Sequence, residues 1–309
     1  MTEGGGRLSS LSHNSQGALW MLASAVTFAV MATLIKFLGD DYPAALQTFY
    51  RQLAGVVVLL PIIIRHRGAA FATTRPGILI FRASAGTIGV ILSFYAFQHM
   101  PLADANALSF TRTLWLVPLA IFVVREKVGP LRIGAAVVGF LGVLLMVRPG
   151  AGGEFAVGVP ALAMLASSFL FALTVTGMKV LTRDHAPRVI LVWSAFLGLV
   201  FSLPGAALTW RVPEPMDLAL LAAMGVIGVI NQACYIKGMS LGDAAAMAPI
   251  DYTRLIFTAA IGFFLFSEVP TMWTVAGALV VAGSTLFITL REQQLAKSAK
   301  LSAEPDAER

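Results

Sequence analysis

Long apolar runs separated by short polar or proline-containing breaks dominate the chain. Each run approaches the roughly 20 predominantly apolar residues that a helix needs to cross the hydrocarbon core of a bilayer. Proline and charged residues stand at the breaks, where they stop or start helices. The pattern therefore predicts an all-α membrane protein of ten transmembrane helices. The ten runs cover residues 17–38, 44–64, 76–98, 102–124, 130–147, 157–181, 188–209, 216–239, 243–266 and 270–290.

Composition supports the same class. Hydrophobic residues make up 58% of the chain, charged residues 12%, and the mean hydropathy is +0.81, whereas a soluble domain has about 25% charged residues. The lipid bilayer is thus the expected solvent. The net charge of +6 comes from basic residues between the runs, which is typical of membrane topology and excludes a nucleic-acid partner. The single cysteine, Cys234, rules out an internal disulfide bond.

The distribution of Lys and Arg predicts the orientation. With the N-terminus inside, fifteen of the 22 basic residues fall on the cytoplasmic side and only three outside. This bias favours an N-in, C-in arrangement. Residues 1–16 and 291–309 are then cytoplasmic tails, the first run is a retained helix, and the protein is a multi-pass protein of the bacterial inner membrane.

The two halves of the chain repeat one another. Residues 21–38 and 164–181 share nine of 18 positions at an offset of 143, and residues 86–107 resemble 225–246 at an offset of 139. We therefore predict a five-helix repeat at 17–149 and another at 150–290. Because five is an odd number, the halves enter the membrane in opposite orientations, which suits alternating access by a transporter. A duplicated channel, receptor or enzyme scaffold is the alternative.

Several motifs resemble those of a known superfamily. Each half opens on a Met-Leu-Ala-Ser helix and carries a glutamate, Glu126 or Glu268, before its last helix; Phe49-x-Arg51 lies in the second run. From 17 to 290 the chain resembles the EamA-type drug/metabolite transporters, and within them the YddG-type amino-acid exporters. The resemblance implies a carrier that exports aromatic and other neutral amino acids, for which a monomer suffices. A same-fold carrier of another small metabolite is the nearest alternative.

Ionisable residues inside the runs are candidate substrate contacts. A charge at the centre of a membrane helix costs roughly 2.5–3.5 kcal/mol on insertion scales, so it marks function or pairing. Arg112 lies in the fourth run, and Asp251, Tyr252 and Arg254 lie in the ninth. The 139 offset aligns Arg112 with Asp251. These charges either meet the carboxylate and ammonium groups of an amino acid or form a static pair that locks the helices.

Aromatic and amide side chains are further candidates for lining a mainly apolar substrate cavity. Several of the aromatic residues recur at equivalent positions of the two halves, although each one alone is as readily explained by packing or lipid contact. The candidates are Phe28 and Phe171, Tyr50 and Trp193, Tyr95 and Tyr235, and the amides Asn231 and Gln232.

Two equivalent lysines, Lys36 and Lys179, end the first and sixth runs on opposite sides of the membrane. They are candidate gating residues that pair with nearby acids such as Asp40 and Asp184. The alternative is that each lysine extends its ammonium group to the water at the end of a helix.

Motifs for bound cofactors and for catalysis are not visible. The sequence has no phosphate-binding loop with a Gly-Lys-Ser/Thr ending, its four histidines are scattered, and it shows no hydrolase arrangement. We therefore expect no metal, no cofactor and no enzymatic activity, and a small molecule as the partner. A membrane sensor or channel is the competing class. Energy coupling stays open, with Asp251 as the only deep carboxylate.

Overall fold

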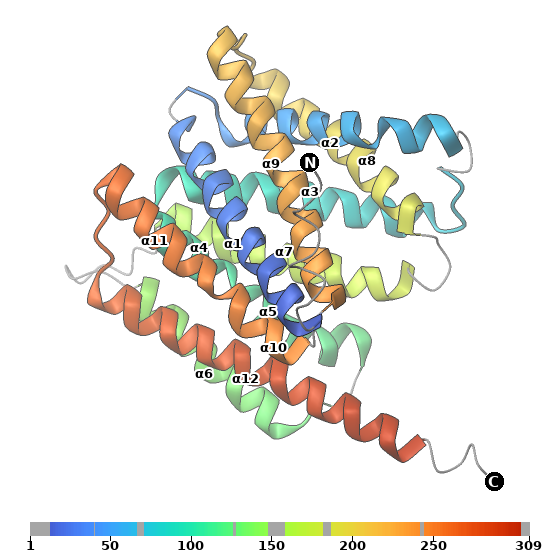
Figure 1. Ribbon diagram of the computed structural model, residues 1–309, viewed down its shortest axis with the longest axis vertical. Helices are drawn as coiled ribbons and strands as arrows, with labels where there is room; N and C mark the ends of the chain where they lie inside the picture. The colour runs from blue at the N-terminus through green and yellow to red at the C-terminus, as the bar shows by residue number, and fades with distance from the viewer. Residues whose placement is uncertain are drawn as a thin grey trace, which may run out of the picture.

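A computed structural model describes residues 13–39, 41–66, 71–125, 128–147, 158–181, 187–241 and 244–303, and the side chain of Lys179 lies outside this description. The described part is a bundle of helices (Figure 1). The helices are α1 His13–Phe37, α2 Ala44–His66, α3 Pro76–His99, α4 Leu102–Ser109, α5 Thr111–Leu119, the π-helix η2 Ala120–Val124, α6 Pro130–Val147, α7 Val159–Leu181, α8 Pro187–Leu208, α9 Pro215–Leu241, α10 Ala244–Asp251, α11 Thr253–Phe266 and α12 Met272–Ala303.

These helices correspond to the ten predicted spans. In the described part of the chain, nine helical segments are long and apolar enough to cross a membrane, and the 23-residue helix α2 supplies a further span. The fourth span is divided into α4, α5 and η2, and the ninth into α10 and α11. The last helix does not end at residue 290 but continues to Ala303.

The two halves pack through matching pairs of helices. The most extensive contacts join α1 to α9, α7 to α3, α2 to α8 and α6 to α12, and each pair takes one helix from each half. Because α1 is equivalent to α7 and α3 to α9, the first two pairs are copies of one another. Figure 1 shows α2 and α8 at one edge of the bundle and α6 and α12 at the opposite edge. The chain therefore folds as two inverted five-helix repeats.

Small residues allow the closest of these contacts. A Cβ atom added to Gly142 of α6 would lie 2.8 Å from a side-chain carbon of Val280 and 3.0 Å from the carbonyl oxygen of Gly277, both in α12. Helices in a bilayer approach through such small residues because lipid supplies little hydrophobic force between them. The opposite faces of α6 and α12 carry exposed leucines such as Leu144 and Leu279, as expected for lipid contact.

Candidate functional site

Each half contains one interrupted span, and the two interruptions fall at the same place in the repeat. The break lies at Phe110 between α4 and α5, and at Tyr252 between α10 and α11. From these points the chain reads Phe-Thr-Arg at 110–112 and Tyr-Thr-Arg at 252–254, an offset of 142. Arg112 is therefore equivalent to Arg254, and the predicted equivalence of Arg112 with Asp251 is wrong by three residues.

Helix length explains the error. Helix α3 has 24 residues whereas its equivalent α9 has 27, so the offset changes from 139 at the start of these helices to 142 at their end. The ends of the interrupted spans agree with the larger value. Arg125 and Ser267, the non-glycine residues with positive φ in the described chain, follow η2 and α11 at an offset of 142.

Arg254 lies at the centre of the contacts around the two breaks. Its guanidinium carbon is 4.0 Å from the ring centroid of Phe110 and 5.0 Å from that of Phe28, within the range of cation–π attraction. One of its terminal nitrogens donates a hydrogen bond to the Ser109 hydroxyl at 3.2 Å. The Phe110 ring also packs against Tyr252, with centroids 4.4 Å apart. The breaks of both halves and helix α1 thus meet at one guanidinium.

The charges of this cluster do not form contact pairs. Arg112 and Asp251 are near enough to Arg254 to act on its charge, yet within the described part of the chain no ion pair joins any two of these residues. All three side chains are half-buried. The predicted static pair is therefore not formed, and the cluster presents charges of both signs at the middle of two spans.

Other predicted lining residues surround this cluster in part. Tyr235 of α9 interacts electrostatically with Arg254, and the Tyr252 hydroxyl is hydrogen bonded to Thr285 of α12. On α3, Tyr95 stacks on His99 with centroids 4.2 Å apart. Phe171 of α7 packs against the backbone of α3 at a glycine, where an added Cβ would lie 3.4 Å from its ring.

Four predicted residues belong elsewhere. The Tyr50 ring stacks on Trp210, 6.3 Å between centroids, and Trp193 donates a hydrogen bond to a loop carbonyl at residue 71 over 3.2 Å. Asn231 donates to the carbonyl oxygen of residue 24 at 2.7 Å and so ties α9 to α1. Gln232 is exposed on the surface of α9. The structure does not bring these four side chains to Arg254, because local packing already uses three of them.

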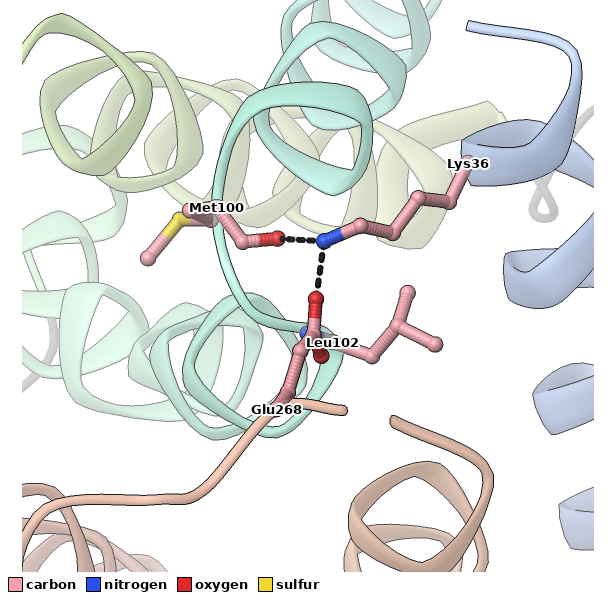
Figure 2. Close-up of polar contacts among 4 residues, drawn as sticks. All are labelled: Lys36, Met100, Leu102 and Glu268. Atoms are coloured by element: carbon pink, nitrogen blue, oxygen red, sulfur yellow. Dashed lines mark hydrogen bonds and ion pairs between the residues drawn. The ribbon is translucent and has the colours of Figure 1, made fainter. Parts of the chain in front are cut away.

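A second polar site lies where the charge distribution places the outer side of the membrane. Lys36 at the end of α1 forms an ion pair with Glu268 and donates a hydrogen bond to the Met100 carbonyl oxygen at 2.8 Å. The other Glu268 oxygen accepts a hydrogen bond from the Leu102 backbone N–H at 2.8 Å. Figure 2 shows these four residues, which we call the outer latch. The latch joins both halves of the chain.

The partner of Lys36 differs from the prediction. Asp40 and Asp184, the predicted partners of Lys36 and Lys179, both lie outside the described residues, and Lys36 pairs with Glu268 instead. The ion pair suits its place because the Lys36 and Glu268 side chains are only 16% and 13% exposed. In addition, a carboxylate at the N-terminus of α4 is stabilised by the helix dipole. The sequence signal was present, since Lys36 and Glu268 each have a counterpart in the other half.

Ten spans in two inverted repeats, with charged breaks at equivalent depths, define a polytopic membrane carrier. The chain belongs to the EamA-like transporter family, whose model matches residues 15–148 and 159–290. It is similar to the S-adenosylmethionine uptake transporter of Rickettsia prowazekii (strain Madrid E), with 30% identity over 90% of this chain and 94% of the relative. The riboflavin transporter of Vibrio cholerae is 27% identical over 90% of this chain and 94% of its own length.

A third relative transports in the opposite direction. The pseudopaline exporter CntI of Pseudomonas aeruginosa (strain UCBPP-PA14) is 26% identical over 86% of this chain and 93% of its own length. A solved crystal structure with a TM-score of 0.60 covers 91% of this chain and 99% of that chain at 16% identity, which shows the fold alone. The protein is therefore a secondary transporter of small metabolites in the bacterial inner membrane, and the predicted EamA-type family is confirmed. The closer resemblance to amino-acid exporters stays a prediction.

Proposed function

We propose that the protein is an alternating-access exporter of amino acids and of metabolites that retain an amino-acid head group, with aromatic and other neutral amino acids as the simplest cargo. The observation that carries the proposal is the unpaired cluster of Arg112, Asp251 and Arg254 at the two broken spans. An arginine suits a carboxylate because its planar donors match the two oxygens. A buried aspartate suits an ammonium group.

The surroundings of the cluster favour a planar side chain on the cargo. Phe28, Phe110 and Tyr252 provide aromatic surface beside the guanidinium of Arg254. S-adenosylmethionine, which the Rickettsia relative is named for, also combines an amino-acid head with a planar base. It is a second candidate cargo, favoured by 30% identity over 90% of the chain.

The outer latch supplies one gate of the proposed cycle. Lys36 and Glu268 close the outer ends of α1, α3 and α4 against the second half. Opening toward the outside requires this ion pair to separate. Lys179, the repeat counterpart of Lys36, is the proposed gating residue of the cytoplasmic side. The two halves, 17–149 and 150–290, exchange conformations between the two states.

The test is counterflow into proteoliposomes that contain the purified full chain. Vesicles preloaded with unlabelled phenylalanine should accumulate labelled phenylalanine transiently and with saturation. Asp251→Asn and Arg254→Gln should each lower this uptake by roughly tenfold or more, because each leaves one end of the zwitterion unpaired. Arg211→Gln is the control, since Arg211 pairs with Asp41 at an exposed site.

Other outcomes separate the alternatives. Counterflow with S-adenosylmethionine but not with phenylalanine would assign the larger cargo. A flux that rises linearly with concentration would indicate a channel. Absence of flux with every amino-acid-headed compound would refute the proposed cargo class.

A further inference from the structure

A third intramembrane arginine, Arg51 of α2, lies away from the broken spans and has no assigned role. It faces α9 at a glycine: a Cβ added to Gly228 would lie 3.3 Å from the Arg51 Nε and 3.3 Å from the sulfur of Met31. Its guanidinium carbon lies 5.9 Å from the ring centroid of Phe94 in α3. Helices α1, α2, α3 and α9 therefore converge on this side chain.

Arg51 is distinguished by its lack of polar partners. Arg82 of α3 donates a hydrogen bond to the Ser194 hydroxyl at 2.6 Å, and Arg254 donates one to Ser109. In the described part of the chain Arg51 forms no ion pair and no hydrogen bond, and its Nε is buried without a partner. Burying a charge in this way is costly unless a counter-charge arrives. The missing partner is expected to be an anion.

Aromatic rings connect Arg51 to the charged cluster. Phe94 and Phe97 are three residues apart on one face of α3. The Phe97 ring meets Phe28 at a centroid distance of 5.9 Å, and Phe28 lies 5.0 Å from the guanidinium carbon of Arg254. Arg51 and Arg254 thus stand at the two ends of a strip of three phenylalanines.

We infer that Arg51 binds a second anionic group of the cargo, at the end opposite the amino-acid head group held near Arg254. The preferred cargo is then an amino-acid-headed metabolite with a planar body and a further carboxylate. This inference rests on the proposed function and narrows its cargo class from neutral to acid-bearing compounds. Transport brings the anion into the membrane together with the molecule that carries it, so Arg51 needs no resident counter-ion.

Two ligands that differ by one carboxylate test the inference. Phenylalanine has the head group and the ring, and 4-carboxyphenylalanine adds an acid at the far end of the ring. Their binding to the purified full chain is measured by competition for counterflow. We expect the wild-type protein to prefer the diacid by about tenfold or more, the size expected for one charge-assisted hydrogen bond.

The variants then locate the preference. Arg51→Gln should abolish most of the tenfold ratio, whereas Arg51→Lys, which keeps the charge, should retain part of it. Arg82→Gln is the matched control, because it removes an intramembrane arginine that already has a protein partner, and it should keep the full ratio. The unfolding temperature without ligand identifies any variant that is simply unfolded, and the Arg51→Lys ratio then decides.

Two results would overturn the inference while leaving the proposed function intact. The first is a wild-type protein that binds both compounds equally well, and the second is an Arg51→Gln protein that keeps the wild-type preference. If neither compound competes in any variant, the amino-acid head group itself is excluded, and the proposed function fails together with the inference.

Discussion

Breaking the outer latch should open the protein toward the outside. In Glu268→Gln, Lys36 loses its counter-charge, while the Leu102 N–H keeps an amide oxygen as an acceptor. Removing one partner of a buried ion pair costs about 3–5 kcal/mol. Because these side chains are 16% and 13% exposed at one end of the bundle, we expect the lower end of that range. A change of about 3 kcal/mol shifts a conformational equilibrium by roughly 100-fold.

The assay is labelling of an introduced cysteine by a membrane-impermeant thiol reagent applied from outside. The native Cys234 is buried in α9 and is first replaced by alanine. A cysteine at Phe28, beside Arg254, then reports whether outside solution reaches the central cluster. Glu268→Gln and Lys36→Met should each raise the labelling rate by at least tenfold. The readout needs no knowledge of the cargo.

A charge swap sharpens the test. Lys36→Glu combined with Glu268→Lys restores an ion pair, but a lysine at 268 faces the positive end of the α4 dipole and cannot accept the Leu102 hydrogen bond. The swap should therefore recover only part of the closed state. Asp41→Asn is the control, because its pair with Arg211 is about 60% exposed and contributes at most about 1 kcal/mol. Equal labelling of wild type, Glu268→Gln and Lys36→Met would refute the gate.

Two further predictions concern the scaffold. Gly142→Leu should lower the unfolding temperature, because the added side chain would collide with Val280 and Gly277 of α12, and overpacking costs typically about 1–3 kcal/mol; an unchanged unfolding temperature would contradict the close packing. Tyr42, in the loop before α2, donates a hydrogen bond to Asp217 at 2.7 Å, which together with burial raises the pKa of Tyr42. Its contribution to stability is thus complete below pH 10 and lost as the pH rises through the raised pKa, so Tyr42→Phe should weaken the alkaline loss of stability seen in denaturation series; a loss of the same size in both proteins would contradict it.

Hydrophobic pattern predicted the spans because the bilayer imposes the same length and polarity on every one of them. The breaks inside the fourth and ninth spans were not predicted, since no polar run marks them. The alignment of Arg112 failed for a related reason. Three additional residues in α9 leave its apolar pattern intact, so the shift of register shows only once both helices are seen to break at Phe110 and Tyr252.

Candidate site residues could be predicted by charge but not by aromaticity. A charge inside a span is costly wherever it points, so Arg254 and Asp251 were identifiable from the sequence. An aromatic ring is satisfied by lipid, loop or core alike. Trp193 and Tyr50 recur in the repeat, yet one packs against a loop and the other against Trp210. The pairing of Lys36 with Glu268, 232 residues away, depends on the fold and could not be read from local spacing.

The corrected repeat makes one asymmetry informative. With Arg112 equivalent to Arg254, Ser109 is equivalent to Asp251, so only the second half places a carboxylate before its break. If that carboxylate holds the cargo's ammonium group, Asp251→Ser, which makes the halves alike, should abolish counterflow without unfolding the protein.

The reciprocal change, Ser109→Asp, tests the same reasoning from the other side. Because a terminal nitrogen of Arg254 already lies 3.2 Å from the Ser109 hydroxyl, the new carboxylate should form an ion pair with Arg254 and compete with the cargo's carboxylate. A hydrogen bond to a charged group contributes about 1.5–3 kcal/mol, so the unfolding temperature should rise while the apparent affinity for cargo falls by at least tenfold. A variant that transports normally would show that Arg254 does not bind the cargo, and that the cluster only holds the broken helices together.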